Sequence, residues 1–238
     1  MARHTELPDS ASELVAELRA ALPMHADQVN AEQQQRYLKT DEPMLGLPIP
    51  LLRKIVRQSV RTPLSPPTLY NAARELWDGA THRDFRRAAI MLLLVPKHAA
   101  TLDSSAMDVV EHFVRTGAWW DLVDECVHVH NYIRGPRGSE NFDTEFARML
   151  RWARDPDRWI RRFAILCQLQ AKGDTDPTLL SEVISMNLED TEFFVAKAIG
   201  WALRDYARTA PEWVRNFVAD HPTMQPLSRR EALKHLGA

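Results

Sequence analysis

The chain has 238 residues, 45% of them hydrophobic and 26% charged, a composition typical of a soluble globular protein with a sizeable core. Its formal net charge of -2 neither supports nor excludes a nucleic-acid partner, because such binding needs positive potential on one face only. No apolar run reaches the roughly 18 residues that a membrane span requires, so no membrane partner is expected. Cys126 and Cys167 lie in apolar helical patterns without CxxC spacing, and no signal-peptide pattern opens the chain, which together indicate a cytoplasmic protein.

The spacing of apolar residues predicts an all-α protein. Apolar residues recur every three or four positions almost throughout, and no Asn-Gly or Asp-Gly dipeptide separates alternating runs. Helices of about 12 to 18 residues, in pairs recurring about every 35 to 45 residues, predict stacked antiparallel pairs of the HEAT-like kind. We therefore expect a single solenoid domain over residues 1–238 with a concave groove.

The expected elements begin with a distinct N-terminal region and continue with marked helix starts. Residues from 1 to about 60 are expected to form a helical cap and leading segment. In this segment "GLPIP" is predicted to be an extended turn, because the residue before each of Pro48 and Pro50 is biased away from the α region. Ser228 followed by Glu231 has the spacing of a capping box. Helix starts are predicted from capping residues and prolines at Ser65, Asp155, Asp176, Ala210 and Ser228.

The segment "AWWDLVDECVHVH" places Trp120, Asp124 and His128 on one helical stripe, at i, i+4 and i+8. Asp121 and Glu125 are expected on the solvent side. A tryptophan in a helical repeat is most often a packing residue, and an aspartate beside it more often caps a helix or pairs with an arginine than catalyses. The pattern therefore leaves both a structural and a catalytic role open.

Two further segments combine aromatic and basic residues. In "DRWIRRFAILCQLQ", Arg161 and Arg162 emerge beside an apolar face, where a structural salt bridge is at least as well supported as a ligand contact. In "FFVAKAIGWALRDYA", Lys197, Trp201 and Arg204 share a stripe that would suit a sugar-phosphate backbone. The histidines lack partners at zinc-ligand spacing, so no metal is expected. These patterns alone predict a helical-repeat protein with an anion-binding groove.

The motifs "WWDLVD", "WIRRFAILCQLQ" and "FFVAKAIGWALRDYART", in this order, resemble those of the AlkD-like DNA alkylation repair enzymes, a HEAT-like-repeat family of alkylpurine DNA glycosylases. The resemblance runs from about residue 25 to the C-terminus. It implies that the catalytic residues are Asp124, Trp120 and Trp201. It implies that the DNA-contacting residues include Arg162, with Arg161 as the register alternative, and Tyr37. Lys197 and Arg204 are expected to join them as phosphate contacts.

The activity that the resemblance implies is hydrolysis of the N-glycosidic bond of cationic N3- and N7-alkylated purines in duplex DNA, which initiates base excision repair. A cationic base leaves as a neutral molecule, so no general acid is needed, unlike in most glycoside hydrolases. One carboxylate can then stabilise the cationic sugar and orient a water. The resemblance also implies recognition from the backbone side without a deep base pocket. We expect a monomer that needs no cofactor.

A non-enzymatic helical-repeat module that binds DNA or another protein is the alternative. Asp124 favours the enzyme, because a carboxylate in the groove of a pure DNA binder would repel the polyanion. A scaffold that binds only proteins would leave the cationic stripe of Lys197, Trp201 and Arg204 unexplained.

Overall fold

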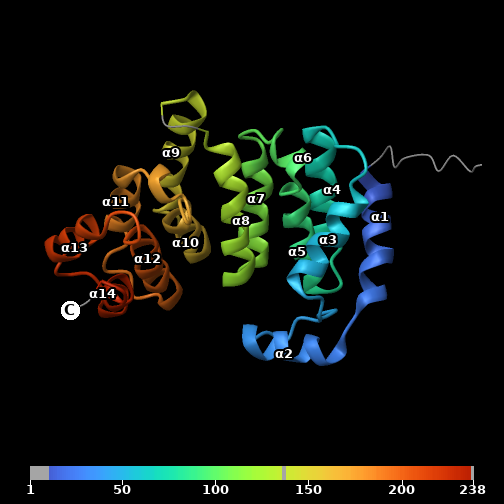
Figure 1. Ribbon diagram of the computed structural model, residues 1–238, viewed down its shortest axis with the longest axis horizontal. Coiled ribbons are helices and arrows are strands. Elements are labelled where there is room, and N and C mark those ends of the chain that lie inside the picture. Colours follow the sequence, from blue (N-terminus) through green and yellow to red (C-terminus); the bar gives the residue numbers. More distant parts are fainter. Residues whose placement is uncertain (1–10, 136–137, 237–238) are drawn as a thin grey trace, which may run out of the picture. The chain divides into compact units, whose positions relative to one another are not determined.

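The computed structural model describes residues 11–135 and 138–236, which contain fourteen α-helices, two short 3-10 helices and no strand (Figure 1). The predicted all-α class is therefore confirmed. The α-helices range from 4 to 14 residues, mostly shorter than expected, because many begin at a proline and end in a turn. None of the helices in these described ranges is both long and apolar enough to cross a bilayer. The chain divides into two compact units, Met1–Val110 and Glu111–Ala238.

The first unit is built on four helices that pack against one another. Helix α1 contacts α3 and α4, and α5 contacts the same two helices. Leu18, Leu52, Leu69 and Ile90 are buried among them. Figure 1 shows α2 running crosswise to α1. The helices of this unit are α1 (Ala11–Ala21), α2 (Gln28–Leu38), α3 (Ile49–Ser59), α4 (Pro66–Asp78), α5 (Arg83–Leu93) and α6 (Pro96–Ala99), with the 3-10 helix η1 at Leu22–His25.

The extended turn predicted at "GLPIP" lies between α2 and α3. Buried Asp84 stabilises it by accepting hydrogen bonds from the backbone N–H groups of Leu45 (2.7 Å) and Leu47 (3.1 Å). Gly46 has φ +81°, and a Cβ there would lie 2.2 Å from the Asp27 carbonyl oxygen, so the chain needs glycine at this turn. Pro48 is extended, as expected, but Ile49 already begins α3.

The second unit shows the alternation of a helical repeat. Helix α8 packs on α10, α10 on α12, and α12 on α14, whereas α9 packs on α11 and α13 on α12 and α14. The predicted helical-repeat class is therefore confirmed, and it places every second helix in one row. The helices of this unit are α8 (Trp120–Ile133), α9 (Glu140–Trp152), α10 (Arg158–Leu166), α11 (Pro177–Ser185), α12 (Phe193–Tyr206), α13 (Pro211–Asp220) and α14 (Pro226–Leu233), with η2 at Lys172–Asp174; α7 (Ala106–Gly117) runs from the first unit into the second.

Most of the predicted helix starts are confirmed, and one is wrong. Three predicted start residues are N-caps, namely Ser65, Asp176 and Ala210, and α10 starts two residues later than predicted, with Asp157 as its N-cap. The capping box at Ser228 is wrong, because α14 begins at Pro226 with Gln225 as its N-cap. Ser228 instead donates a hydrogen bond to the carbonyl oxygen of Ala196, and Glu231 forms ion pairs with α12. Proline at the first helical position outweighs the serine signal here.

Candidate functional site

A buried ion pair between Asp124 of α8 and Arg162 of α10 forms the centre of the candidate site. Arg162 Nε donates to Asp124 Oδ1 (2.8 Å) and Arg162 Nη2 to Asp124 Oδ2 (2.7 Å), a bidentate arrangement. Arg162 Nη1 donates to the carbonyl oxygen of Phe194 in α12 (2.6 Å). The side chains of Arg162 and Asp124 are 5% and 11% exposed. The arginine therefore joins three consecutive helices of one row around a single carboxylate.

Local sequence explains how each partner reaches this position. Trp120 begins α8, and Asp124 lies one turn later on the same stripe. The side chain of Asp157 caps α10 by accepting from Trp159 N, and the helix begins at Arg158. Packing of the apolar face of α10 buries Arg162 with it, whereas Arg161 is not among the buried residues of the helix. One residue of register on a helix thus decides which arginine meets the carboxylate.

Three aromatic rings gather next to the ion pair. The Trp159 and Phe194 ring centroids are 4.9 Å apart, and Trp119 lies 5.9 Å from Trp159 and 5.4 Å from Phe194. The guanidinium carbon of Arg162 is 6.0 Å from the Phe194 ring centroid, within the range of a cation-π contact. The Phe194 ring therefore lies beside the guanidinium group of the pair, and Trp119 and Trp159 pack against Phe194.

The charge state of Asp124 reflects opposing effects. Burial raises the pKa of Asp124, the hydrogen bonds and positive charge of Arg162 counteract this rise, and the nearby charge of Asp121 adds to it. Asp121 is only 7% exposed, so its predicted position on the solvent side is wrong, and Glu125 is partly buried. Asp124 is therefore a desolvated carboxylate whose negative charge depends on Arg162.

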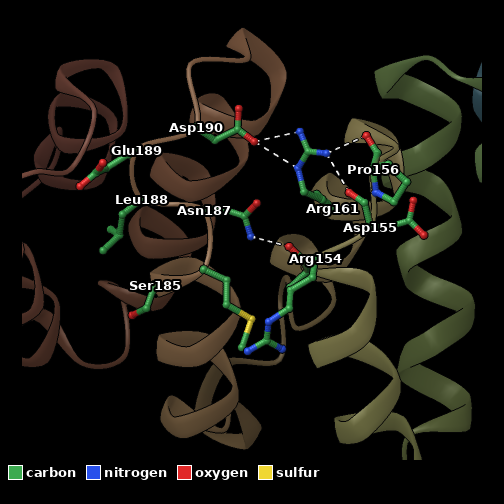
Figure 2. A pocket seen from close by; sticks show the side chains of 11 residues that line it. Arg154, Asp155, Pro156, Arg161, Ser185, Asn187, Leu188, Glu189 and Asp190 are labelled. Atoms are coloured by element: carbon green, nitrogen blue, oxygen red, sulfur yellow. Dashed lines mark hydrogen bonds and ion pairs between the residues drawn. The ribbon is translucent and has the colours of Figure 1, made fainter.

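Arg161 lies at a separate pocket of about 650 Å³, between the loop before α10 and the loop before α12. Figure 2 shows Arg161 reaching from Asp190 to the carbonyl groups of Asp155 and Pro156. Neither Asp124 nor Arg162 lines this pocket. Arg161 thus links two loops, and the structure does not bring it to the candidate site.

Lys197 and Arg204 both form ion pairs with Glu231 of α14. The Lys197 Nζ to Glu231 Oε1 distance is 2.9 Å, and Arg204 Nη1 pairs with the other carboxylate oxygen. Trp201 is partly buried and lies between the two cations on the α12 stripe. The same stripe begins at Phe194, seven residues before Trp201. Because Arg162 of the Asp124 site donates to the Phe194 carbonyl oxygen, both clusters lie along α12.

The structure brings some of the predicted site residues together. Asp124 meets Arg162, and Lys197 meets Arg204 through Glu231, whereas Tyr37 is 73% exposed on α2 of the first unit. Sequence reasoning missed Trp119, Trp159, Phe194 and Glu231 as members of these clusters. The aromatic dipeptide before "VAKAIGW" was the available signal for Phe194, while nothing local marked Glu231 as a partner of α12. Among the described residues, no group of three or more His, Cys, Asp or Glu side chains is placed to hold a metal ion.

Comparisons with known proteins bear on the family and the fold of the chain. The sequence model of a family described as DNA alkylation repair enzyme matches residues 18–236. A solved structure described as a predicted DNA alkylation repair enzyme from Enterococcus faecalis is similar, with a TM-score of 0.76, 26% identity, and coverage of 90% of this chain and 97% of that chain. AlkD2 from Streptococcus mutans shares the fold, with a TM-score of 0.63, 14% identity, and coverage of 87% and 100%. No curated protein matches the chain. Because the family match covers nearly all of its length, the chain belongs to the DNA alkylation repair enzyme family.

Proposed function

We propose that this protein is a DNA glycosylase that hydrolyses the N-glycosidic bond of cationic N3- and N7-alkylated purines in duplex DNA. The observation that carries the proposal is the Asp124 carboxylate, desolvated, held by two hydrogen bonds from Arg162 and placed one turn after Trp120. Membership of the DNA alkylation repair enzyme family supports the general class of substrate.

The chemistry needs one carboxylate because the leaving base carries its own positive charge. The bond between C1′ and the base nitrogen breaks with its electron pair moving to the base, which departs neutral. The sugar becomes oxocarbenium-like, and the negative charge of Asp124 stabilises it. A water oriented by Asp124 then attacks C1′ and loses its proton to the carboxylate or to solvent. The raised pKa of Asp124 suits this acceptance of a proton.

Arg162 takes a different position from the phosphate contact implied by the family resemblance. Its donors are directed at Asp124 and at the Phe194 carbonyl oxygen, and its side chain is 5% exposed. We therefore assign it the role of orienting Asp124 and keeping this carboxylate ionised. Removing the arginine would leave a buried charge unpaired, which is strongly unfavourable.

The remaining residues are assigned to DNA contacts. Trp120 and Trp201 are proposed to face the sugar, where each indole would contribute about 0.5 to 2 kcal/mol to binding a cation. Lys197 and Arg204, both partly exposed, are proposed to contact phosphates. Tyr37 presents an exposed phenol that could stack on a sugar or base, and Arg161 would contribute through its loops rather than directly.

The central test is release of free base from duplex DNA that contains N7-methylguanine. We expect the purified protein to release it, and Asp124→Asn to lower the single-turnover rate by about 10² or more while the fold and DNA binding persist. The matched control is Asp190→Asn, which removes the carboxylate partner of the neighbouring arginine, Arg161, and should retain excision. DNA binding by the wild-type protein without any base release would instead support the non-enzymatic binding module.

The substrate range tests the single-carboxylate mechanism further. Duplexes carrying N7-methylguanine, a bulkier N7-alkylguanine and hypoxanthine would be compared. We expect release of both cationic bases and retention of hypoxanthine, because a neutral base needs a proton donor that the Asp124 site lacks. Hypoxanthine release at a rate comparable to N7-methylguanine would refute this mechanism. Rejection of the bulky adduct alone would refute only recognition without a closed base pocket.

A further inference from the structure

Glu231 holds both cations of the α12 stripe. The side chains of Lys197 and Arg204 are 37% and 22% exposed, whereas that of Glu231 is 15% exposed. The hydrogen bond and charge of Lys197, followed by those of Arg204, keep the pKa of Glu231 below its ordinary value. Glu231 is therefore a carboxylate anion beneath two cations that remain accessible to solvent.

The packing of α14 on α12 keeps this carboxylate in place. A Cβ on Gly200 would lie 2.4 Å from Glu231 Cβ and 2.9 Å from the Ser228 carbonyl oxygen, so the two helices approach closely at this glycine. The Ser228 hydroxyl also donates to the carbonyl oxygen of Ala196 (2.9 Å). Because the α14 backbone is held so close, the base of the Glu231 side chain stays beside α12 and its carboxylate remains within reach of both cations.

This cluster carries two positive charges and one negative charge, so it retains one net positive charge toward solvent. A DNA phosphate that binds Lys197 or Arg204 must either share that cation with Glu231 or displace the Glu231 carboxylate from it. The carboxylate also repels the phosphate. We propose that Glu231 is an internal competitor for the DNA-binding cations, which lowers affinity for duplex DNA and speeds release of the product. This inference rests on the proposed function, because it assigns Lys197 and Arg204 to phosphate binding.

The test compares Glu231→Gln with Glu212→Gln. Both changes remove one negative charge and one carboxylate partner, but Glu212 pairs with Arg215 on α13 and its side chain is 77% exposed. We expect Glu231→Gln to bind a short undamaged duplex about fivefold to tenfold more tightly, which corresponds to relief of two partly buried ion pairs. The ratio of steady-state turnover to the single-turnover rate should fall, because product leaves more slowly. Glu212→Gln should resemble the wild type in both measurements.

A double-mutant cycle separates competition from structural damage. Glu231→Gln would also be made in a background carrying Lys197→Gln and Arg204→Gln, where we expect it to change affinity less than about twofold. Loosening of α14 would lower affinity in both backgrounds, and unchanged or weaker binding by Glu231→Gln in the wild-type background overturns the inference. Absence of base release from N7-methylguanine DNA by the wild-type protein would instead count against the proposed function, whatever the affinities.

Discussion

Arg161 and Arg162 are adjacent in the sequence, yet their guanidinium groups hold different carboxylates. Arg162 pairs with Asp124 on α8, and Arg161 pairs with Asp190 before α12. Successive residues of a helix point about 100° apart, so the Arg162 side chain is directed toward the neighbouring helices and the Arg161 side chain toward the loops. Substituting each arginine in turn therefore separates the effect of holding Asp124, the proposed catalytic carboxylate, from the effect of changing a nearby positive charge.

Replacement of Arg162 by lysine should change the pH dependence of excision. Burial raises the Asp124 pKa and Arg162 counteracts this, so a single-point ammonium in its place should let the pKa rise further. The protonated acid cannot stabilise a cationic sugar, so activity is lost as pH falls through this pKa. We expect Arg162→Lys to move the acid limb of the single-turnover rate to higher pH and to reduce the rate at neutral pH about tenfold.

Arg161→Lys is the control for this measurement. It alters the partner of Asp190 and should leave the position of the acid limb unchanged. An acid limb that stays at the wild-type pH in Arg162→Lys would show that Arg162 does not govern the ionisation of Asp124.

At the scale of elements, α12 serves two surfaces at once. One stripe of the helix carries Phe194, Lys197 and Trp201. The helix must also approach α14 closely, and it does so at Gly200. Glycine normally weakens a helix interior by about 1 kcal/mol relative to alanine. Its presence here is explained by the neighbouring helix, since a Cβ would overlap Glu231 and the Ser228 carbonyl oxygen.

Gly200→Ala should therefore destabilise the protein although alanine favours helices. Overpacking costs about 1 to 3 kcal/mol, which exceeds the gain in helix propensity. We expect a net loss of about 1 to 2 kcal/mol in the free energy of unfolding, measured by urea denaturation. Gly173→Ala is the control, because a Cβ at Gly173 meets no atom within 4 Å. Equal or greater stability of Gly200→Ala would show that α14 can move away from α12 at little cost.

At the scale of the whole molecule, each compact unit contains a fully buried histidine. His98 in the first unit accepts from Leu64 N (3.1 Å) and its other ring nitrogen lies 2.8 Å from the Leu92 carbonyl oxygen. His130 in the second unit has Nδ1 3.2 Å from the Cys167 carbonyl oxygen, which requires Nδ1 to carry the proton. Burial lowers the pKa of both, and that of His130 to about 4.

Stability should fall on acidification because of His130. The unfolded chain takes up a proton on this imidazole near its ordinary pKa of 6.5, whereas the folded chain resists protonation down to about pH 4. Stability is thus complete above pH 6.5 and is lost as pH falls toward 4. The expected contribution of this residue is a loss of about 2 kcal/mol at pH 5 relative to neutral pH, measured by urea denaturation across that range.

His130→Gln should flatten this pH dependence even if the variant is less stable overall. His25→Gln, which removes an exposed imidazole in η1, should leave it unchanged. The same steep loss of stability in His130→Gln as in the wild type would assign the acid sensitivity to other groups, of which His98 is the next candidate.

The features that the sequence alone determined are those set by neighbouring residues along the chain. The helical class follows from apolar spacing, and three helix starts follow from a capping residue or proline, because both act within one turn. The shared stripe of Trp120 and Asp124, and that of Lys197, Trp201 and Arg204, are likewise consequences of helical periodicity. Periodicity left the roles of these residues open, and only the family resemblance named some of them as catalytic or DNA-binding candidates.

Only the tertiary structure decided which of these residues meet. Asp124 and Arg162 are 38 positions apart, and Lys197 and Glu231 are 34 apart, so their pairing depends on how successive helices of a row pack. In the packed structure Asp121 is buried and Arg162 pairs with a carboxylate. Glu231 pairs with a cation of α12 and does not cap the start of α14. A helix presents several faces of comparable polarity, and the burial of apolar surface against neighbouring helices selects which face turns inward. That selection depends on contacts between distant residues, which local spacing does not specify.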